Sequence, residues 1–354
     1  MRVWICFVVF MALCVSSALA QSVLRVPEDY PTIQAAADAA IAGDTIRVGP
    51  GVYCGAAVTK KLRIVGESEP TITTCAAPRD TMGPTGFLLD GRTEGVDPSG
   101  TTIQHFNFSG LHSAVFAYAA HNVTFEYNTV QCAGVNCGAV RGLEGSSYWT
   151  VSHNKITSDD NPTDPAHRNY GTVILNNAGS GWTVTHNTIT GTGVTGGIYF
   201  LKNLTFLPNE RSTNNYAAFN YIEGASDWYG IGVTGQDGAV ITNNKIFVPT
   251  SAGAIGQCRA WGIEVSNANI LTSINSVIVN NDTMNTAIGI IVLLDKTKGP
   301  GNSAGMVLRG NFGTLSLNQP WQPCNAGDIT HVVSSRAIST MIVCDAFGVC
   351  TEGK

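Results

Sequence analysis

The sequence predicts an all-β solenoid, in which short strands form coils that stack on one another. Three observations support this fold class: an asparagine phrase recurs along the chain, a glycine phrase alternates with it, and no helical period lies between them. The asparagine phrases recur every 24 to 37 residues and end at Asn128, Asn154, Asn187, Asn220, Asn244 and Asn281. A unit of this length cannot bury its own apolar face, so neighbouring units must stack on it.

Each asparagine marks a corner of the coil. Apolar residues recur three positions before it and two positions after it, as Val151 and Ile156 do around Asn154. These positions are five residues apart, so the two-residue alternation of a strand slips by one between them, and the chain must turn there. We expect the asparagine itself to adopt left-handed backbone angles, with its amide paired to the amides of the coils above and below.

The glycine phrase opens a second strand in each coil. Its copies begin at Gly138, Gly171, Gly197, Gly230, Gly262 and Gly289. Stacked coils with asparagine corners resemble the right-handed parallel β-helix, or pectate-lyase-like, superfamily. The resemblance covers residues 23–315 and implies a right-handed parallel β-helix solenoid.

The N-terminal segment predicts a secretory signal peptide over residues 1–20. Met1 and Arg2 precede an apolar run, and Ala18-Leu-Ala20 provides a small-residue cleavage site. No other apolar run approaches the ~18 residues of a membrane span. We therefore expect no membrane span after signal removal, and a protein that is secreted, periplasmic or at the cell surface.

Residues 26–53 predict a short N-terminal capping helix. Thr32 can cap it, Ile33, Ala37 and Ile41 form its inner face, and Gly43 ends it. A helix here would cover the open end of the solenoid and block edge-to-edge association. The segment resembles the opening of the NosD-like group and of several polysaccharide lyases. This similarity concerns the fold and implies no chemistry.

Composition agrees with an exported, glycine-rich fold. Charged residues make up 13% of the chain, and the net charge is −5. A negative net charge does not favour nucleic acid as a partner. Eight cysteines follow the signal peptide, an even number that favours disulfides. Plausible pairs are Cys54 with Cys75, Cys132 with Cys137, and Cys344 with Cys350; zinc binding by the close pairs is the alternative.

The repeated phrases stop after Asn311. We therefore assign residues 21–316 to the β-helix domain with its N-terminal cap, and residues 317–354 to a disulfide-stapled C-terminal cap. A segment this short is not expected to form a separate domain, because it cannot bury a sufficient core of its own. Because both ends of the stack are capped, we expect a monomer.

Inserted loops predict a groove over the glycine-phrase strands. The loops span residues 158–168, 202–213 and 249–259, and the predicted outward row between them is Val140, Val173, Tyr199, Gly232, Glu264 and Ile291. Aromatic faces beside polar groups are typical of sugar-binding sites. The predicted substrate-binding residues are Tyr199, Trp228, Tyr229, Trp261 and Glu264. The alternative is that these side chains simply pack beneath the loops.

The loop residues also suit elimination chemistry on a uronate. Such a reaction needs a cation beside the substrate carboxylate and a base for the neighbouring proton. The predicted base is Lys202 or His167, and the predicted carboxylate ligand is Arg168, Arg211 or a calcium ion. The aspartates Asp159, Asp160 and Asp164 could hold Ca²⁺, or they could simply form solvated turns.

Two other arrangements are weaker candidates. Glu264 and Asp295 could pair as carboxylates for hydrolysis, although scattered surface charge is the stronger explanation. His153 and His186 occupy equivalent places in successive coils, where they could share a metal ion or form a stacked ladder.

Two functions therefore remain open. One is a polysaccharide lyase acting on a uronate-containing glycan. The other is a non-catalytic extracellular β-helix that binds glycans or serves as a surface or adhesion element. The motifs of polygalacturonase-like hydrolases, pectin methylesterases, pectate lyases and mannuronan epimerases are missing, so no specific enzyme family is matched. A polysaccharide is the expected partner under both hypotheses.

Overall fold

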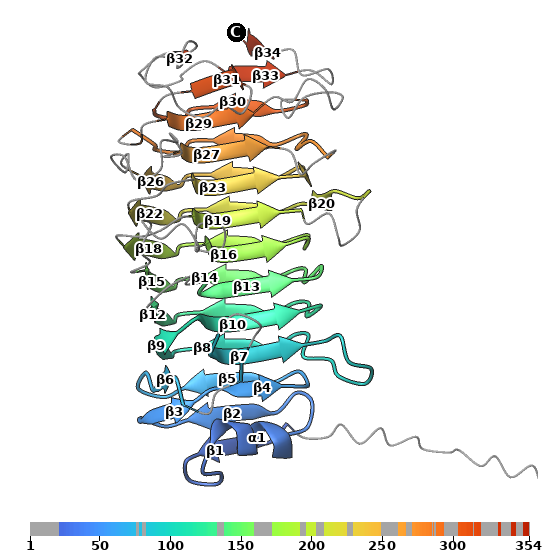
Figure 1. Ribbon diagram of the computed structural model, residues 1–354, viewed down its shortest axis with the longest axis vertical. Helices are drawn as coiled ribbons and strands as arrows, with labels where there is room; N and C mark the ends of the chain where they lie inside the picture. The colour runs from blue at the N-terminus through green and yellow to red at the C-terminus, as the bar shows by residue number, and fades with distance from the viewer. Residues whose placement is uncertain are drawn as a thin grey trace, which may run out of the picture.

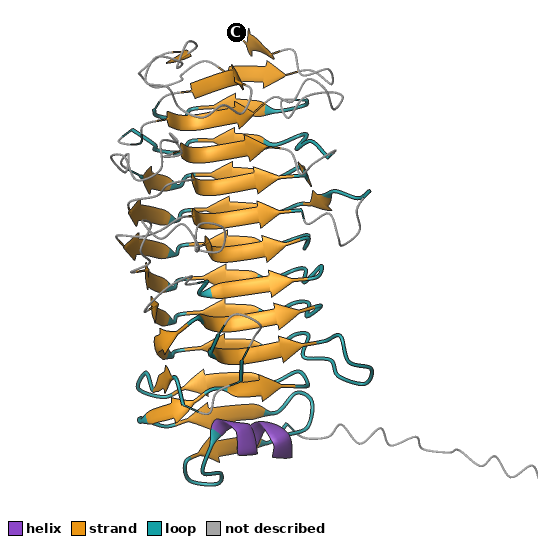
Figure 2. Ribbon diagram, viewed as in Figure 1, coloured by secondary structure: helices purple, strands orange, loops and turns teal. Residues whose placement is uncertain are grey.

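The computed structural model is a right-handed parallel β-helix (Figure 1), which confirms the predicted fold class. It describes residues 21–75, 78–79, 83–132, 138–158, 172–191, 196–202, 209–224, 229–248, 261–266, 271–284, 286, 288–293, 304–313, 315–319, 332–333, 341–344 and 350–353. The predicted signal peptide lies outside these residues. Coils stack along one axis from the N-terminal helix toward the C-terminus, and strands dominate them (Figure 2).

Three long sheets run along the stack, and the shortest of them, sheet B, ends at β26. Sheet A contains β1 (Val23–Val26), β2 (Thr45–Val48), β5 (Arg63–Gly66), β8 (Thr102–Gln104), β11 (Thr124–Glu126), β14 (Thr150–Ser152), β17 (Thr183–Thr185), β21 (Tyr216–Ala218), β25 (Val240–Thr242), β28 (Val277–Val279), β30 (Val307–Arg309), β33 (Met341–Cys344) and β34 (Cys350–Gly353). Sheet B contains β3 (Val52–Cys54), β6 (Thr71–Thr73), β9 (Asn107–Leu111), β12 (Thr129–Cys132), β15 (Lys155–Ser158), β18 (Thr188–Gly191), β22 (Tyr221–Gly224) and β26 (Lys245–Phe247).

Sheet C contains β4 (Ala56–Val58), β7 (Thr85–Asp90), β10 (Ser113–Tyr118), β13 (Val140–Leu143), β16 (Thr172–Asn177), β19 (Gly196–Leu201), β23 (Tyr229–Thr234), β27 (Trp261–Ser266), β29 (Ile288–Leu293), β31 (Leu315–Gln319) and β32 (Val332–Val333). A small fourth sheet pairs β20 (Ser212–Thr213) with β24 (Gln236–Asp237).

From β2 to β27 the chain visits sheets A, B and C in turn, and these strands pair in parallel with their equivalents in the neighbouring coils. Among the labelled strands of the described part, antiparallel pairing occurs near the C-terminus, where β30 pairs β33, β31 pairs β32 and β33 pairs β34. The division of the chain at residue 316 stays a prediction, because most of residues 317–354 lie outside the described part.

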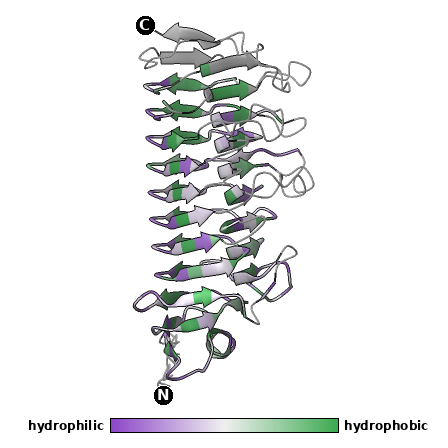
Figure 3. Cartoon of the chain, turned by 60° about the vertical axis from the view of Figure 1, so that its left-hand side comes forward, coloured by the Kyte–Doolittle hydropathy of each residue, from purple (hydrophilic) through white to green (hydrophobic). Residues whose placement is uncertain are grey.

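The core is a set of apolar columns along the axis, and hydrophobic positions recur from coil to coil (Figure 3). The predicted inner positions before and after the asparagine are buried throughout, as Val151 and Ile156 illustrate. In sheet A the column is Ile103, Phe125, Val151, Val184, Ala217, Ile241, Ile278 and Leu308. Burying each valine or isoleucine side chain stabilises the fold by about 1.5–3 kcal/mol.

The predicted N-terminal helix is α1 (Ile33–Ala39), which packs on β1, β2 and β4 at the first coil (Figure 1). The Thr32 hydroxyl caps it by accepting from the Ala35 N–H at 3.1 Å. The helix ends earlier than predicted: Ala40 is its C-cap and Gly43 lies three residues beyond. Ile41 is therefore exposed, not on the inner face. No helix among the described residues is long and apolar enough to cross a membrane.

The asparagines form the predicted amide ladder. The Asn154 N–H and Nδ2 both donate to Oδ1 of Asn187, at 3.1 and 2.9 Å, and the pattern repeats from Asn187 to Asn220. The predicted left-handed angle is wrong by one residue, because the residue before each asparagine adopts it, for example His153 and His186 at φ 57°. This arrangement turns the asparagine inward, where its amide is buried.

The glycine phrase is needed where sheet C begins. A Cβ added at Gly197 would lie 2.5 Å from the Gly230 carbonyl oxygen and 3.0 Å from Ile222 Cδ1, so a larger residue cannot fit. The strand register aligns Tyr199, Gly232, Glu264 and Ile291 as predicted, but Val140 and Val173 belong to the core cluster inside the solenoid. The register places Arg141 and Leu175 in that row instead, in line with Tyr199.

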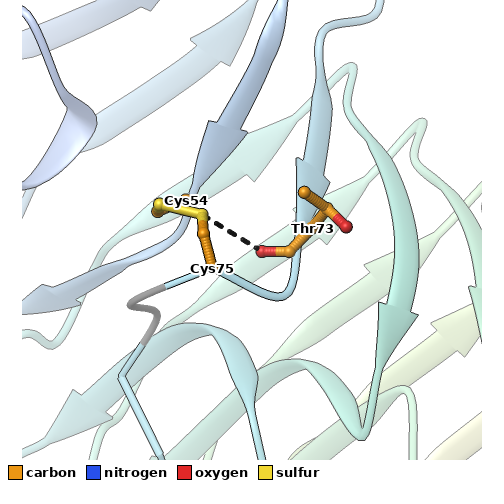
Figure 4. The surroundings of a disulfide bond; sticks show 3 residues. All are labelled: Cys54, Thr73 and Cys75. Carbon is orange, nitrogen blue, oxygen red and sulfur yellow. Dashed lines mark hydrogen bonds between the residues drawn. A yellow bond between two sulfur atoms is a disulfide. The ribbon is translucent and has the colours of Figure 1, made fainter.

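One predicted disulfide is described in full. Cys54 and Cys75 are bonded, which links β3 to the turn after β6 (Figure 4). Cys132 is also disulfide-bonded, and its predicted partner Cys137 lies outside the described residues. The backbones of Cys344 and Cys350 are register partners on β33 and β34.

Candidate functional site

The described part of the chain contains six of the predicted site residues. Lys202 and Arg211 line one pocket, whereas Tyr199, Tyr229, Trp261 and Glu264 lie on sheet C. The other predicted residues lie outside the described part, and their roles stay predictions: Asp159, Asp160, Asp164, His167, Arg168, Trp228 and Asp295.

The pocket lies over the turns that lead from sheet C to sheet A in four successive coils, and we call it the turn pocket. Its volume is about 310 Å³. Its charged and titratable residues are His121, Glu144, Lys202, Glu210 and Arg211. Its small residues, which leave the space open, are Ala119, Gly145, Ser147, Ala178 and Ser180.

Buried tryptophans hold two of these turns. The rings of Trp149 and Trp182 stack in the core with centroids 4.7 Å apart and planes at 2°. Trp149 Nε1 donates to the Ala120 carbonyl at 2.8 Å, and Trp182 Nε1 donates to the Ser146 carbonyl at 2.7 Å. The stack therefore fixes the floor of the turn pocket from beneath.

Serine hydroxyls connect one turn to the next. Ser147 Oγ accepts from the Ser180 N–H, and Ser180 Oγ accepts from the Thr213 N–H, both at 3.0 Å. The backbone of Lys202 also donates to the Thr234 carbonyl at 3.0 Å. The pocket residues are thus held on a rigid frame, as a preorganised site requires.

Lys202 is the buried cation of the pocket. The residue is only 2% exposed. Burial lowers the pKa of its ammonium group below the ordinary lysine value, because desolvation disfavours the charged form. The nearby Glu210 carboxylate opposes this shift. Lys202 is therefore easier to deprotonate than an exposed lysine, which suits a proton-accepting role.

Arg211 is oriented by a loop from a later coil. Its Nε donates to the Thr272 carbonyl at 2.7 Å, and its Nη2 lies 3.3 Å from Thr272 Oγ1. These bonds use one edge of the guanidinium. The group has further N–H donors that can bind a carboxylate.

A carboxylate lies two coils away from Lys202. Glu144 is 38% exposed and lies 3.4 Å from Arg92 Nη1. Arg92 is itself engaged by Asp90 at 2.6 and 2.8 Å, and its guanidinium lies 3.5 Å above the Tyr118 ring centroid. The hydrogen bonds from Arg92 hold the pKa of Asp90 below its usual range.

His121 occupies the end of the pocket nearest the N-terminus. Its Nδ1 lies 3.2 Å from the Ser147 backbone N, which can only donate. Nδ1 is therefore the acceptor, so the neutral ring carries its proton on Nε2. This tautomer makes His121 a hydrogen-bond donor for a ligand.

The aromatic residues on sheet C are largely covered. Tyr229 is 3% exposed, Trp261 is 6% exposed and Glu264 is 5% exposed. Tyr199 and Tyr229 pack with centroids 4.7 Å apart, and the Tyr199 hydroxyl accepts from Thr234 Oγ1 at 3.0 Å. Burial is the main cause that raises the pKa of both tyrosines above the ordinary value, and the Glu264 carboxylate adds to it. Substrate binding by these residues stays a prediction.

The histidines at the asparagine corner form an exposed stack. The rings of His153 and His186 lie 4.8 Å apart at 2°, and the stack extends from His105 through Tyr127 to Phe219. Imidazole lone pairs lie in the ring plane, so two parallel rings cannot direct theirs at one ion. This geometry favours the stacked-ladder alternative over a shared metal.

The sequence prediction missed three pocket residues: His121, Glu144 and Glu210. Glu210 lies in the predicted 202–213 loop, next to Arg211. His121 and Glu144 follow sheet C strands in earlier coils, in turns equivalent to the turn that begins at Lys202. The stacking of equivalent turns is the signal that could have identified them.

The chain is similar to known proteins in its architecture only. No protein family model and no curated protein sequence matches the chain. Among solved structures, the chain is similar to an alginate lyase from Paenibacillus sp. str. FPU-7, with 15% identity over 87% of this chain and 92% of that chain and a TM-score of 0.42. It is similar to PfbA, a surface adhesin of Streptococcus pneumoniae, with 11% identity over 88% of this chain and 92% of that chain and a TM-score of 0.44. A GH87 alpha-1,3-glucanase catalytic domain shares 15% identity over 78% of this chain and 54% of that chain, with a TM-score of 0.40.

Proposed function

We propose that this β-helix protein acts outside the cytoplasm on a uronate-containing polysaccharide, as a lyase, through the turn pocket. The observation that carries the proposal is that Lys202 and Arg211 line one pocket, the turn pocket, whose turns are linked by hydrogen bonds. The Cys54–Cys75 disulfide supports an oxidising compartment.

The proposed chemistry is β-elimination. Arg211 binds the uronate carboxylate and stabilises the negative charge that develops there. The neutral amine of Lys202 removes the proton on the carbon beside the carboxylate. A carbon–carbon double bond then forms as the glycosidic carbon–oxygen bond breaks, and the departing oxygen takes up a proton.

Calcium is part of the proposal through Asp159, Asp160 and Asp164, which would supply hard oxygen ligands. These residues lie outside the described part of the chain, so no reaction step is assigned to the ion. His167 and Arg168 remain alternative candidates for the base and the carboxylate ligand.

The test is an ultraviolet assay for unsaturated uronate products, with folded mature protein on pectate, alginate and glycosaminoglycans. Calcium is present in one arm and chelated in the other. We expect product formation that Lys202→Ala and Arg211→Gln each abolish. A flat signal on every polymer from protein with intact far-ultraviolet circular dichroism would eliminate the lyase proposal.

Non-catalytic glycan binding is the second candidate. The observation that favours it is the burial of the proposed base: Lys202 is only 2% exposed, which restricts its contact with a reacting sugar. Polymer binding by calorimetry without product formation would select this candidate over the lyase.

A further inference from the structure

The two ends of the turn pocket, which lie along the solenoid axis, differ in charge. At one end lie Lys202, Arg211 and one carboxylate, Glu210, so this end carries no net negative charge even when the Lys202 amine is neutral. Glu144 lies two coils away, at the other end. It pairs with Arg92, which also pairs with Asp90, so the two carboxylates and one guanidinium together carry one net negative charge. The pocket therefore favours an anion at one end only.

The distance between the two ends fits a chain that lies along the axis. The turns of Glu144 and Lys202 are separated by two coil spacings of about 4.8 Å each. The small residues Ala178 and Ser180 line the pocket from the intervening turn. A pocket of this length holds more than one sugar ring. Neighbouring sugars of one chain would then meet opposite charges.

The negative end offers partners for a neutral sugar. His121 Nε2–H can donate to a carbonyl or hydroxyl oxygen, and the Glu144 carboxylate can accept from a hydroxyl or an amide N–H. A second uronate at this end would place its carboxylate beside Glu144. Like charges at such a distance repel, which disfavours a chain made of uronates alone.

We propose that the turn pocket selects an alternating polysaccharide, with a uronate unit at Lys202 and Arg211 and an uncharged, acetamido- or hydroxyl-bearing unit at Glu144 and His121. This inference rests on the proposed function, because it assigns the uronate to Lys202 and Arg211. It names a substrate class that the fold does not specify.

The test compares binding of two unsulfated polymers to the full chain by calorimetry, at equal carboxylate concentration. Hyaluronan alternates a uronate with an acetamido sugar, whereas alginate consists of uronates alone. We expect wild-type protein to prefer hyaluronan. Glu144→Gln removes the repelling charge with little change of shape. We expect it to tighten alginate binding about threefold, which is the repulsion between Glu144 and a uronate carboxylate about 6 Å away in a solvated pocket.

Glu67→Gln is the matched control, because Glu67 is an exposed carboxylate paired with Arg47 on an early coil and outside the turn pocket. Equal or tighter binding of alginate by wild type, or identical effects of the two glutamine variants, would overturn the selectivity while leaving the proposed function intact. Binding of neither polymer would overturn the selectivity, and the product assay on pectate and the other polymers decides the proposed function separately. Hyaluronan binding that Arg211→Gln leaves unchanged would overturn the placement of the uronate.

Discussion

Removing one amide from the asparagine ladder is the sharpest test of what holds the coils together. In Asn187→Ala, five hydrogen bonds disappear. Asn187 Oδ1 accepts from the Asn154 N–H and Nδ2, and Asn187 Nδ2 donates to Val151 O, Thr185 O and Asn220 Oδ1, all within 2.9–3.1 Å. The side chain is buried, so water cannot replace these partners.

The expected cost follows from the groups left without partners. Each buried polar group that loses its hydrogen bond costs about 1–3 kcal/mol. With the Asn154 N–H left without its acceptor, we expect a loss of about 1–3 kcal/mol in the free energy of unfolding, a large part of the total stability of a typical domain. The Asn154 N–H is the clearest case, since Asn187 Oδ1 is its acceptor in the ladder.

The assay is urea denaturation followed by tryptophan fluorescence, because Trp182 lies in the coil of Asn187 and Trp149 lies in the preceding coil. Asn243→Gly is the matched control. It removes an exposed amide that bonds to Thr242 Oγ1. The backbone φ at this position is 53°, which glycine tolerates. A loss below about 1 kcal/mol for Asn187→Ala, or equal losses in both variants, would refute the reasoning.

Three further changes test other parts of the molecule. Trp182→Phe keeps the ring stack but orphans the buried Ser146 carbonyl, so we expect about 1–3 kcal/mol of destabilisation by the same assay; an unchanged midpoint would mean that the indole N–H does not hold the turn. Replacing Cys54 and Cys75 by alanine opens a link with a sequence separation of 21, so we expect roughly 3 kcal/mol of lost stability by thermal unfolding; equal stability of the oxidised wild type and the double variant would contradict this. Lys202→Met should raise stability at neutral pH, because burying a charged ammonium group costs free energy. Burial lowers the pKa of Lys202 in the folded state. Between that pKa and the ordinary lysine value, the unfolded chain binds more protons than the folded chain, so stability increases with pH. Wild-type stability should rise with pH across that window while the methionine variant lacks this rise, and identical pH profiles would show that Lys202 is not desolvated.

Periodicity explains how much of the fold could be predicted. Coils repeat the same local environment, so the inner positions around each asparagine carry the same apolar signal several times over, and an error in one copy is corrected by the others. The capping helix can also be predicted from the sequence, because Thr32 and the alanine-rich segment are local signals. Its end was misplaced, since Ala40 ends the helix before Gly43.

The backbone conformation at the corner is harder to predict from the sequence. The asparagine was expected in the left-handed region, but His153 and His186 occupy it instead. The physical reason is that the buried amide must face the next coil, so the preceding residue makes the turn. Likewise, the outward row of sheet C is misassigned at Val140 and Val173, because the strand register places them in line with Ile198 and Gly197, one and two positions before Tyr199.

The sequence by itself determined the solenoid, its corners and its N-terminal cap, because these depend on repeated local patterns. Only the tertiary structure decided which chemical groups meet. Glu144 and Lys202 lie far apart in the sequence, yet they line one pocket because the turns of successive coils stack. The same stacking buries Lys202, a residue that its neighbours in sequence would leave on a polar loop. Burial and proximity are properties of the packed coils, so no local pattern carries them.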